Sequence, residues 1–322
     1  MKVFRDDLKI TSVPPRRLNH IFAQKCTWEV IMKQLVILSG KGGTGKTTVA
    51  ASFIELSQDK AFADCDVDAP NLHLIHATNI QPELENFYGY KKAVKYEEVC
   101  INCGKCEQLC RFGAIKEGKV NPYECEGCGV CEEFCPVVYS DGKKAIRLEN
   151  NVSGKTILYK YNDRVFSSAE LEMGNGASGK LVTQVRKNLY NSISGPELVI
   201  IDGSPGIGCP VIASVTGADM VLVVAEPTLS GIHDMERIVE TAKKFGATCA
   251  VCVNKYDVNF ENTQIIEEYC HNHNILMVGR IPFDSKVLDA LNDGKTVVML
   301  ESSSAKDAII SIWEKVSELL QS

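Results

Sequence analysis

Short apolar runs alternate with amphipathic segments along most of the chain. Strands are predicted at residues 34–39, 61–66, 156–161, 164–171, 198–202, 220–225 and 249–253, with one more near 276–278. Helices are predicted at residues 46–56, 180–191, 231–244, 261–271, 285–291 and 305–320. Because strands that alternate with helices pair in parallel beneath helical layers, this pattern predicts an α/β fold with a doubly wound, mostly parallel sheet.

The alternation stops at about residue 90 and returns after residue 149, and between these points the composition shifts to Cys, Glu and Gly. Residues 1–31 carry only weak periodicity and a Pro-Pro-Arg-Arg break. We therefore predict an N-terminal extension at 1–31, which is either genuine or the product of an upstream start codon. The α/β domain is predicted in two parts, 32–90 and 150–322, with a small α+β domain inserted at 91–149.

Composition and charge narrow the classes of function. The chain has 322 residues, of which 45% are hydrophobic, enough for an ordinary packed core. Its longest apolar runs, such as residues 220–224, are too short to span a membrane, and the first residues lack an apolar signal core. A net charge of −6 without a dense basic stretch argues against nucleic acid as the main partner. We expect a cytoplasmic protein without membrane insertion.

Eight of the 14 cysteines lie between residues 100 and 135 and form an internal repeat. Cys100, Cys103, Cys106 and Cys110 recur 25 residues later as Cys125, Cys128, Cys131 and Cys135. Each run reads C-x2-C-x2-C-x3-C. In a reducing compartment such clustering indicates metal ligands rather than disulfides.

This spacing is that of bacterial-type ferredoxins, in which the fourth cysteine of each run ligates the cluster of the other run. One predicted [4Fe–4S] cluster is therefore held by Cys100, Cys103, Cys106 and Cys135, and the second by Cys110, Cys125, Cys128 and Cys131. Two structural zinc sites are the alternative, because C-x-x-C pairs also bind zinc. Zinc does not require three consecutive cysteines at this spacing. Arg111 stands where a proline often follows the fourth cysteine, but this difference removes no ligand.

A glycine-rich sequence joins the first predicted strand to the first predicted helix. Residues 40–47 fit the phosphate-binding pattern G-x-x-x-x-G-K-[ST], in which backbone N–H groups at the helix start hold phosphate oxygens. The predicted contacts are Gly40, Gly42, Gly43, Thr44, Gly45, Lys46, Thr47 and Thr48. We expect Lys46 to neutralise the β- and γ-phosphates and Thr47 to ligate Mg²⁺.

The run KGGTGKTT, with its second lysine at Lys41, resembles the deviant Walker motif of the MinD/ParA and nitrogenase iron protein superfamily. Residues 64–72 are similar to switch I of that superfamily, and residues 199–206 are similar to switch II. With the cysteine block between the two switches, the chain from about residue 32 onward resembles MinD-superfamily ATPases that contain an inserted 2[4Fe–4S] ferredoxin domain. The resemblance does not indicate the physiological substrate.

The resemblance implies roles for four charged residues. Lys41 would reach the partner's nucleotide across a homodimer, while Asp66, with Asp68 second, would orient the attacking water. Asp202 would hold Mg²⁺ through water. Each aspartate alone could equally be a turn residue at a strand end, but the three occur in the expected order.

The identity of the base is open at this point. Asn254, Lys255 and Asp257 match the N-K-x-D pattern by which many GTPases read guanine. The resembling family often has Asn-Lys here too and generally uses ATP, with a later segment such as residues 280–283, including Pro282, flanking the base. We favour ATP, and Asp257 keeps GTP open.

Two further positions have competing interpretations. Cys209 follows switch II at an offset that resembles a cluster-ligating cysteine of the nitrogenase iron protein, or it is a small buried residue at a helix start. The loop at residues 174–180 opens a helix and could bind an anion, touch a partner or serve only as a connection.

We expect an ATPase that couples nucleotide state to electron transfer by two [4Fe–4S] clusters, handing electrons to an unknown protein partner. An iron–sulfur assembly or carrier ATPase is the first alternative. Carriers usually place a C-x-x-C near the C-terminus, whereas Cys249 and Cys252 lie along a predicted buried strand. A spatial-positioning ATPase with a structural insert is the second alternative. Such proteins usually need a membrane-binding tail, and residues 305–322 predict a packing helix.

Overall fold

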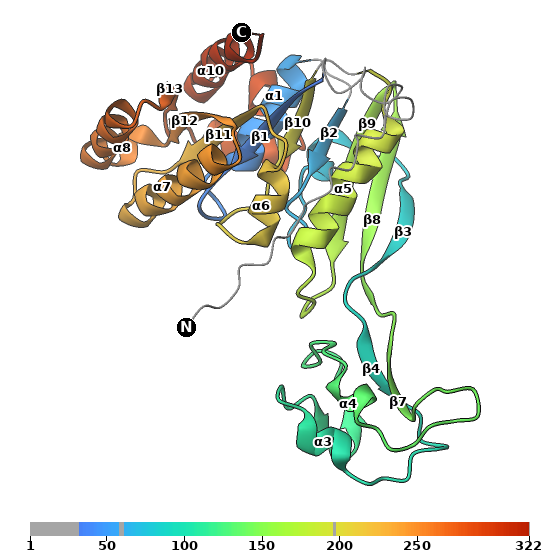
Figure 1. Cartoon of the computed structure of the whole chain (residues 1–322). Helices are drawn as coiled ribbons and strands as arrows, with labels where there is room; N and C mark the ends of the chain where they lie inside the picture. The colour runs from blue at the N-terminus through green and yellow to red at the C-terminus, as the bar shows by residue number, and fades with distance from the viewer. Residues whose placement is uncertain (1–31, 58–60, 196–197, 322) are drawn as a thin grey trace, which may run out of the picture.

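The computed structural model describes residues 32–57, 61–195 and 198–321 and has two parts of unequal size. Figure 1 shows a large α/β domain with a small lobe beside one end of it. The predicted extension at 1–31 lies outside the described residues. Within the described residues, no helix is both long and apolar enough to cross a membrane.

The large domain is built on a nine-stranded sheet with the order β13-β12-β11-β1-β10-β2-β9-β8-β3. Its strands are β1 (Lys33–Leu38), β2 (Ala61–Asp64), β3 (Glu83–Tyr88), β8 (Val152–Tyr161), β9 (Arg164–Leu171), β10 (Leu198–Asp202), β11 (Met220–Ala225), β12 (Thr248–Asn254) and β13 (Leu276–Ile281). All pairs from β13 to β9 are parallel. The predicted α/β fold with a large, mostly parallel sheet is therefore confirmed.

The sheet becomes antiparallel at one edge, because β8 pairs antiparallel with both β9 and β3. Asn162 and Asp163 join β8 to β9 with positive φ angles of 44° and 62°, which is the requirement of a tight two-residue hairpin turn. Strand β3 was not predicted, since its sequence ELENFY is mostly exposed and lacks an apolar run. Its place in the sheet comes from backbone pairing with β8.

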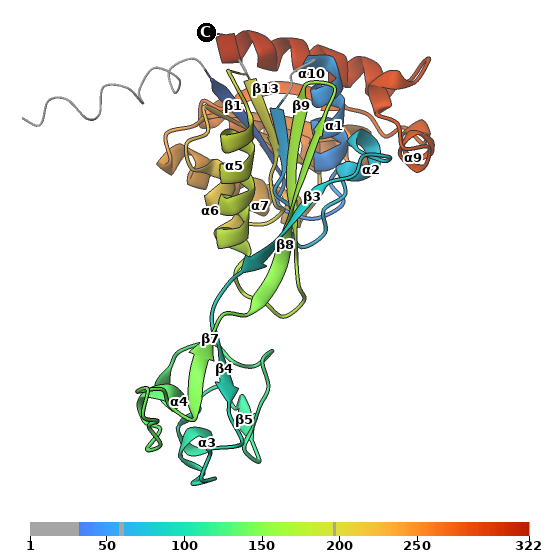
Figure 2. The ribbon, with the colours of Figure 1, turned by 90° about the vertical axis from the view of Figure 1, so that its right-hand side faces the viewer.

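Helices cover both faces of the sheet, as Figure 2 shows from the side. They are α1 (Lys46–Ser57), α2 (His73–His76), α5 (Ser178–Ser192), α6 (Cys209–Val215), α7 (Leu229–Lys244), α8 (Phe260–Asn272), α9 (Lys286–Asn292) and α10 (Ser304–Gln321), with 3-10 turns η1 (Tyr256–Val258) and η2 (Val297–Met299). Side chains alternate between the faces of β1. Val36 and Leu38 join the core formed with α5, α6, α7 and α8, whereas Leu35 and Ile37 join the core formed with α1 and α10.

The small lobe comprises residues 92–149 and is connected to the large domain through β3 and β8. Its elements are β4 (Lys92–Lys95), α3 (Lys105–Leu109), β5 (Ile115–Lys116), β6 (Lys119–Val120), α4 (Val130–Glu133) and β7 (Ile146–Glu149). Strands β4 and β7 pair antiparallel at the point where the chain enters and leaves the lobe. The buried core of the lobe is Ala93, Ala114, Ile115, Cys125 and Ile146.

Candidate functional site

The phosphate loop lies at the carboxyl end of β1, where parallel α/β sheets place their ligands. Gly43 and Gly45 have φ angles of 80° and 90°, which side chains rarely tolerate. A Cβ atom at Gly45 would also lie 2.3 Å from Nδ2 of Asn254. This Nδ2 donates a hydrogen bond of 2.7 Å to the carbonyl of Thr44. Asn254 therefore holds the phosphate loop from the end of β12.

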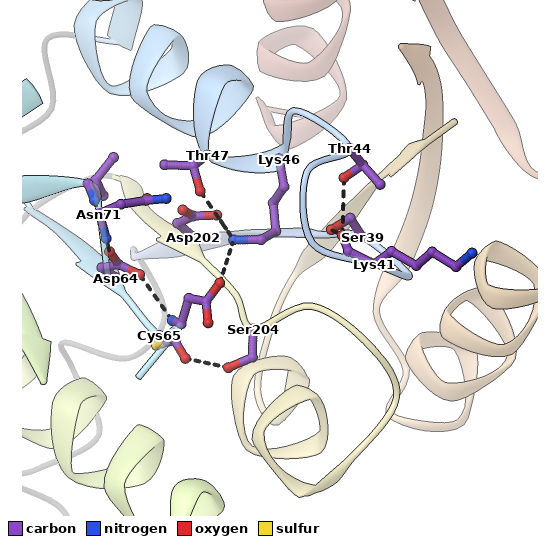
Figure 3. Close-up of polar contacts among 12 residues, drawn as sticks. Ser39, Lys41, Thr44, Lys46, Thr47, Asp64, Cys65, Asn71, Asp202 and Ser204 are labelled. Carbon is purple, nitrogen blue, oxygen red and sulfur yellow. Dashed lines mark hydrogen bonds and ion pairs between the residues drawn. The ribbon is translucent and has the colours of Figure 1, made fainter. Parts of the chain in front are cut away.

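Lys46 is buried at the start of α1 with 5% of its side chain exposed. Its Nζ lies 2.5 Å from Oδ1 of Asp202, at the end of β10, and 3.5 Å from Oγ1 of Thr47 (Figure 3). Burial alone would lower the pKa of Lys46, but the Asp202 carboxylate raises it. Lys46 is therefore a buried cation at the phosphate loop, held in place by Asp202.

The two carboxylate oxygens of Asp202 have different surroundings. Oδ1 pairs with Lys46, whereas Oδ2 is buried and has no hydrogen-bond partner among the described residues. An unpaired buried carboxylate oxygen costs free energy unless a donor or a cation satisfies it. With Thr47 nearby, this oxygen fits the chemistry of a Mg²⁺ site.

Asp66 lies in the loop after β2, with its Oδ2 4.0 Å from Nζ of Lys46. Burial and the neighbouring Asp202 raise the pKa of Asp66 to about 6, against the opposing effect of Lys46. The structure thus brings Lys46, Asp66 and Asp202 together. Asp68 is exposed and is not among the partners of Lys46.

Asp64 organises the loop around Asp66. Its Oδ1 accepts a backbone hydrogen bond from Asp66, and its Oδ2 accepts from Asn71 and Leu72, each at 3.0 Å. Burial beside Asp202 raises the pKa of Asp64 to about 7. Sequence reasoning missed this residue as a site residue. Its signal was available, because Asp64 ends a buried strand with a polar side chain that needs partners.

The two predicted switch segments are hydrogen-bonded to each other and to β1. Ser204 Oγ donates to the Cys65 carbonyl (Figure 3), and Cys65 N donates to the Asp202 carbonyl at 2.7 Å. Gly206 N donates to the carbonyl of Ser39 at 2.9 Å. A displacement of either segment must therefore break these hydrogen bonds or move the other segment with it.

Helix α7 also borders the phosphate loop. A Cβ at Gly40 would lie 2.1 Å from Cβ of Asp234, so only glycine fits there. Lys41 is exposed on the loop, and its Nζ donates to Oγ of Ser230 in the first turn of α7. Sequence reasoning did not find Ser230 or Asp234, because no local pattern connects them to the loop.

The residues predicted to flank the base lie on two adjoining segments. Oδ1 of Asp257 accepts a hydrogen bond of 2.8 Å from the backbone N of Phe283, directly after the half-buried Pro282. Lys255 forms an ion pair of 2.9 Å with Glu226. One oxygen of Asp257 thus joins the loop after β12 to the loop after β13.

In the small lobe, Cys100, Cys103, Cys106 and Cys135 line one cavity of about 290 Å³. Cys110, Cys125, Cys128 and Cys131 line a second, narrower cavity of about 20 Å³. None of these eight cysteines, all within the described residues, forms a disulfide. Within the described residues, no group of three or more His, Cys, Asp or Glu side chains converges on a single metal ion. The cysteines therefore surround cavities instead of meeting at a point.

The 25-residue repeat extends to the backbone of the small lobe. Asn102 and Gly127 both have left-handed φ angles, 54° and 64°, and so do Gly104 and Gly129, 73° and 79°. Gly104 precedes α3 and Gly129 precedes α4. At Gly127 a Cβ would lie 2.2 Å from the carbonyl oxygen of Lys91. The two cysteine runs thus form two similar turns, each followed by a short helix.

The cysteines outside the repeat differ in exposure. Cys249 and Cys252 are both buried and belong to the cores on opposite faces of the sheet, as the predicted alternation of their strand indicated. Cys209 is exposed at the start of α6, so its interpretation as a small buried residue is wrong.

Comparisons with known proteins give one consistent family. The CbiA family, described as the CobQ/CobB/MinD/ParA nucleotide binding domain, matches residues 35–297. An uncharacterized protein of Methanocaldococcus jannaschii is 34% identical over 297 residues, covering 90% of this chain and 98% of the relative. An iron-sulfur cluster carrier protein of Pyrococcus abyssi is 24% identical, covering 89% and 86%. The solved structure of the septum site-determining protein MinD from Pyrococcus horikoshii, complexed with Mg-ADP, has a TM-score of 0.54 at 18% identity, covering 89% and 97%.

Proposed function

The chain belongs to the CobQ/CobB/MinD/ParA family of nucleotide-binding domains, and from this premise we propose that it is an ATPase whose nucleotide state controls electron transfer by two [4Fe–4S] clusters. The acceptor is an unknown protein partner. The ATP site is in the large domain, and the clusters are in the small lobe, which we propose to be an inserted ferredoxin-like domain.

The observation that carries the proposal is the division of the eight cysteines between the two cavities. Each cavity is lined by one crossed ligand set, three cysteines from one run and the fourth from the other. A cubane keeps its four ligands apart by its own width, so cysteines around the cavity of about 290 Å³ suit it better than a convergent quartet. The second ligand set surrounds only about 20 Å³ and would have to move apart to hold its cluster. Bound clusters would each supply one-electron chemistry.

Residues of this chain support the clusters beyond the ligands. The backbone N of Ala93 donates to Sγ of Cys125, and the backbone N of Asn102 donates to Sγ of Cys100, both at 3.4 Å. Such bonds stabilise negative charge on ligand sulfur and raise the reduction potential. Lys92, which is buried, donates to the Cys125 carbonyl at 2.5 Å and holds that ligand in place.

In the nucleotide site, Lys46 would bind the β- and γ-phosphates, and Thr47 with Asp202 would hold Mg²⁺. Asp66 lies near Lys46 and is the candidate for orienting the attacking water, while Asp64 positions its loop. Lys41 is exposed and would reach the nucleotide of a second copy in a homodimer. These roles follow the family's chemistry and the contacts of this chain.

The proposed base is adenine. Oδ1 of Asp257 accepts the backbone hydrogen bond of Phe283, and Asn254 is engaged with the phosphate loop. Lys255 is paired with Glu226, so all three fixed residues of the N-K-x-D pattern have structural partners, which leaves less of the pattern to read guanine. Competition between ATP and GTP for the wild-type protein tests this choice.

The deciding experiment measures the midpoint potentials of the clusters without nucleotide, with ADP and with a non-hydrolysable ATP analogue. We expect shifts between these states, because coupled sites change each other's equilibria by about 5–150-fold. A tenfold change corresponds to about 59 mV for a one-electron couple. The shifts should vanish in Lys46→Met, which is designed to lose the phosphate contact. Potentials that are identical in all three states would contradict nucleotide control of electron transfer.

A second function, delivery of clusters to other proteins, is favoured by the similarity to the iron-sulfur cluster carrier protein of Pyrococcus abyssi. The buried Cys249 and Cys252 cannot form a shared exposed site for transient cargo. Cargo would therefore have to be the clusters of the small lobe. Incubation with an iron-free ferredoxin decides between the two: ATP-dependent loss of iron from this chain supports delivery, and retained iron supports electron transfer.

A further inference from the structure

One segment of the large domain contacts the first switch, the helix that follows the second switch, and the small lobe. Residues 171–180, called the linking segment from here on, run from the end of β9 through the first turn of α5. Figures 1 and 2 show this connection at the end of the large domain nearest to the small lobe. We propose that the linking segment transmits the nucleotide state to the small lobe. This inference rests on the nucleotide control proposed above.

The linking segment begins at the first switch. The backbone N of Leu171 donates a hydrogen bond of 2.9 Å to the carbonyl of Val67, the residue that follows Asp66. Val67 is fully buried, so this bond is shielded from competing water. Movement of Asp66 toward or away from a γ-phosphate would therefore shift Leu171 through this hydrogen bond.

The segment also touches the helix that follows the second switch. A Cβ at Gly179 would lie 3.1 Å from Cβ and 3.2 Å from the carbonyl oxygen of Cys209. Cys209 begins α6, seven residues after Asp202 in the chain. Because the starts of α5 and α6 approach this closely, a shift of α6 displaces the first turn of α5.

Two contacts connect the linking segment to residues 89 and 90, where the chain passes from β3 into the small lobe. A Cβ at Gly89 would lie 2.9 Å from Cβ of Ala177. Nζ of Lys180 lies 4.0 Å from the centre of the Tyr90 ring, in a cation–π contact. Gly89 and Tyr90 come just before β4, so the linking segment contacts the chain at the point where it enters the small lobe.

A third contact reaches the lobe itself. A Cβ at Gly174 would lie 3.1 Å from Cδ1 of Tyr123, and Tyr123 precedes Cys125 of the second ligand set by two residues. Beside this contact is a cavity of about 860 Å³, lined by Tyr123 from the lobe and by Lys155 and Met173 from the large domain. The contact is thus a narrow one with open space beside it, which leaves the lobe room to move.

The covalent route between the sites is longer. The chain that leaves Asn71 passes through α2 and then through β3, the exposed edge strand, before it reaches Gly89. An edge strand with an exposed surface has few packed neighbours to carry a displacement. The through-space route runs from Val67 to Leu171 and then from Gly174 to Tyr123.

The test is amide hydrogen exchange on the full chain with its clusters, with and without a non-hydrolysable ATP analogue and Mg²⁺. In the wild type, nucleotide should slow exchange at residues 121–131 and 171–180 by at least about five-fold, the lower end of typical couplings. Tyr123→Ala removes the contact with Gly174, and Lys180→Met removes the contact with Tyr90. Each variant should lose most of the response at 121–131 and still bind nucleotide.

Matched controls use similar side chains at exposed positions. Phe134→Ala truncates an exposed aromatic ring of the same lobe, and Lys187→Met removes an exposed lysine from the same helix as Lys180. Both should keep the wild-type response. Iron content is measured for every variant. Lys180→Met lies outside the lobe and decides the question if Tyr123→Ala fails to retain its clusters.

Two results would overturn the proposed role of the linking segment. The first is no exchange response in the wild type. The second is a full response in the variant that combines Tyr123→Ala with Lys180→Met, or in Lys180→Met alone if variants with Tyr123→Ala do not retain their clusters. Either result could occur together with nucleotide-dependent potentials, which would leave the proposed function standing. Conversely, an exchange response that depends on Tyr123 and Lys180, together with potentials that no nucleotide shifts, would support the linking segment and contradict the proposed function.

Discussion

In the large domain, apolar side chains cover both faces of a nine-stranded sheet, whereas the hydrophobic core of the small lobe is a cluster of five buried residues, one of them Cys125. A core of that size rarely supplies enough stability for an independent fold, and small domains then depend on metals or disulfides. The small lobe, which the structure describes throughout, contains no disulfide. The comparison suggests that the large domain folds through its own core, while the lobe depends on the groups that its cysteines bind.

The two regions also prepare their sites differently. In the large domain, long-range contacts such as the Lys46–Asp202 pair connect residues that are far apart in sequence. In the small lobe, the cysteines are placed by local turns in which Asn102, Gly104, Gly127 and Gly129 have left-handed backbone conformations. The first kind of site requires the whole domain to be folded, and the second requires short segments and a ligand.

Removal of iron should have the largest effect, and the resulting loss of structure should be confined to the small lobe. Because metal binding supplies folding free energy to small metal-binding domains, iron-free protein should lose protection from exchange and proteolysis throughout residues 92–149. The large domain should keep its own unfolding transition and should still bind nucleotide. Hydrogen exchange and limited proteolysis measure this. A lobe that stays protected without iron would contradict the comparison.

Truncation of the large core should lower global stability without loss of iron. Phe62 is buried and stacks on Phe166 with ring centres 4.9 Å apart. Phe62→Ala should reduce the free energy of unfolding by about 3–5 kcal/mol, as for other buried aromatic residues. Urea unfolding measures the change. The control, Phe134→Ala in the small lobe, removes an exposed ring and should cost less than about 0.5 kcal/mol.

Substitutions of the two lysines of the phosphate loop should affect nucleotide binding differently. Lys46 belongs to the site within one chain, whereas Lys41 is proposed to act only in a dimer. Lys46→Met should weaken nucleotide binding by about 1.5–3 kcal/mol, the range for a hydrogen bond to a charged group. Lys41→Met removes the same charge from an exposed position and should leave binding by a single chain unchanged. Isothermal titration at low protein concentration compares them. Equal losses in both variants would contradict a distinct role for Lys41.

The smallest effect concerns acid stability of the large domain. Burial lowers the pKa of His76 to about 4, and its Nε2 lies 3.2 Å from the Ala51 carbonyl. Since the unfolded histidine titrates near 6.5, the stabilisation is present above about pH 6.5 and is lost as pH falls toward 4. Between pH 7.5 and 5 the wild type should lose free energy of unfolding through His76, and His76→Gln should make this loss smaller by about 1–2 kcal/mol. Urea titrations at both pH values measure it. His233→Gln, at an exposed position, should change nothing.

The sequence alone determined the features that depend on local patterns. Alternating apolar and amphipathic segments predicted the mostly parallel sheet, because each segment must bury its own apolar face. The spacing of the cysteines predicted two ligand sets, and the phosphate-loop pattern predicted where nucleotide binds. Both predictions rest on short, contiguous segments, because the residue types and spacing of such segments can be read without knowing their distant partners.

Tertiary structure decided the features that depend on distant residues meeting. Pairing with β8 made the exposed segment 83–88 a strand, although it lacks an apolar pattern. Folding also placed Asn254 against the phosphate loop and Asp64 under the Asp66 loop. The contact between Gly174 and Tyr123 likewise joins segments from different parts of the molecule. No local pattern encodes such pairs, because a hydrogen bond or close contact across the fold requires both partners to be positioned by their own elements first.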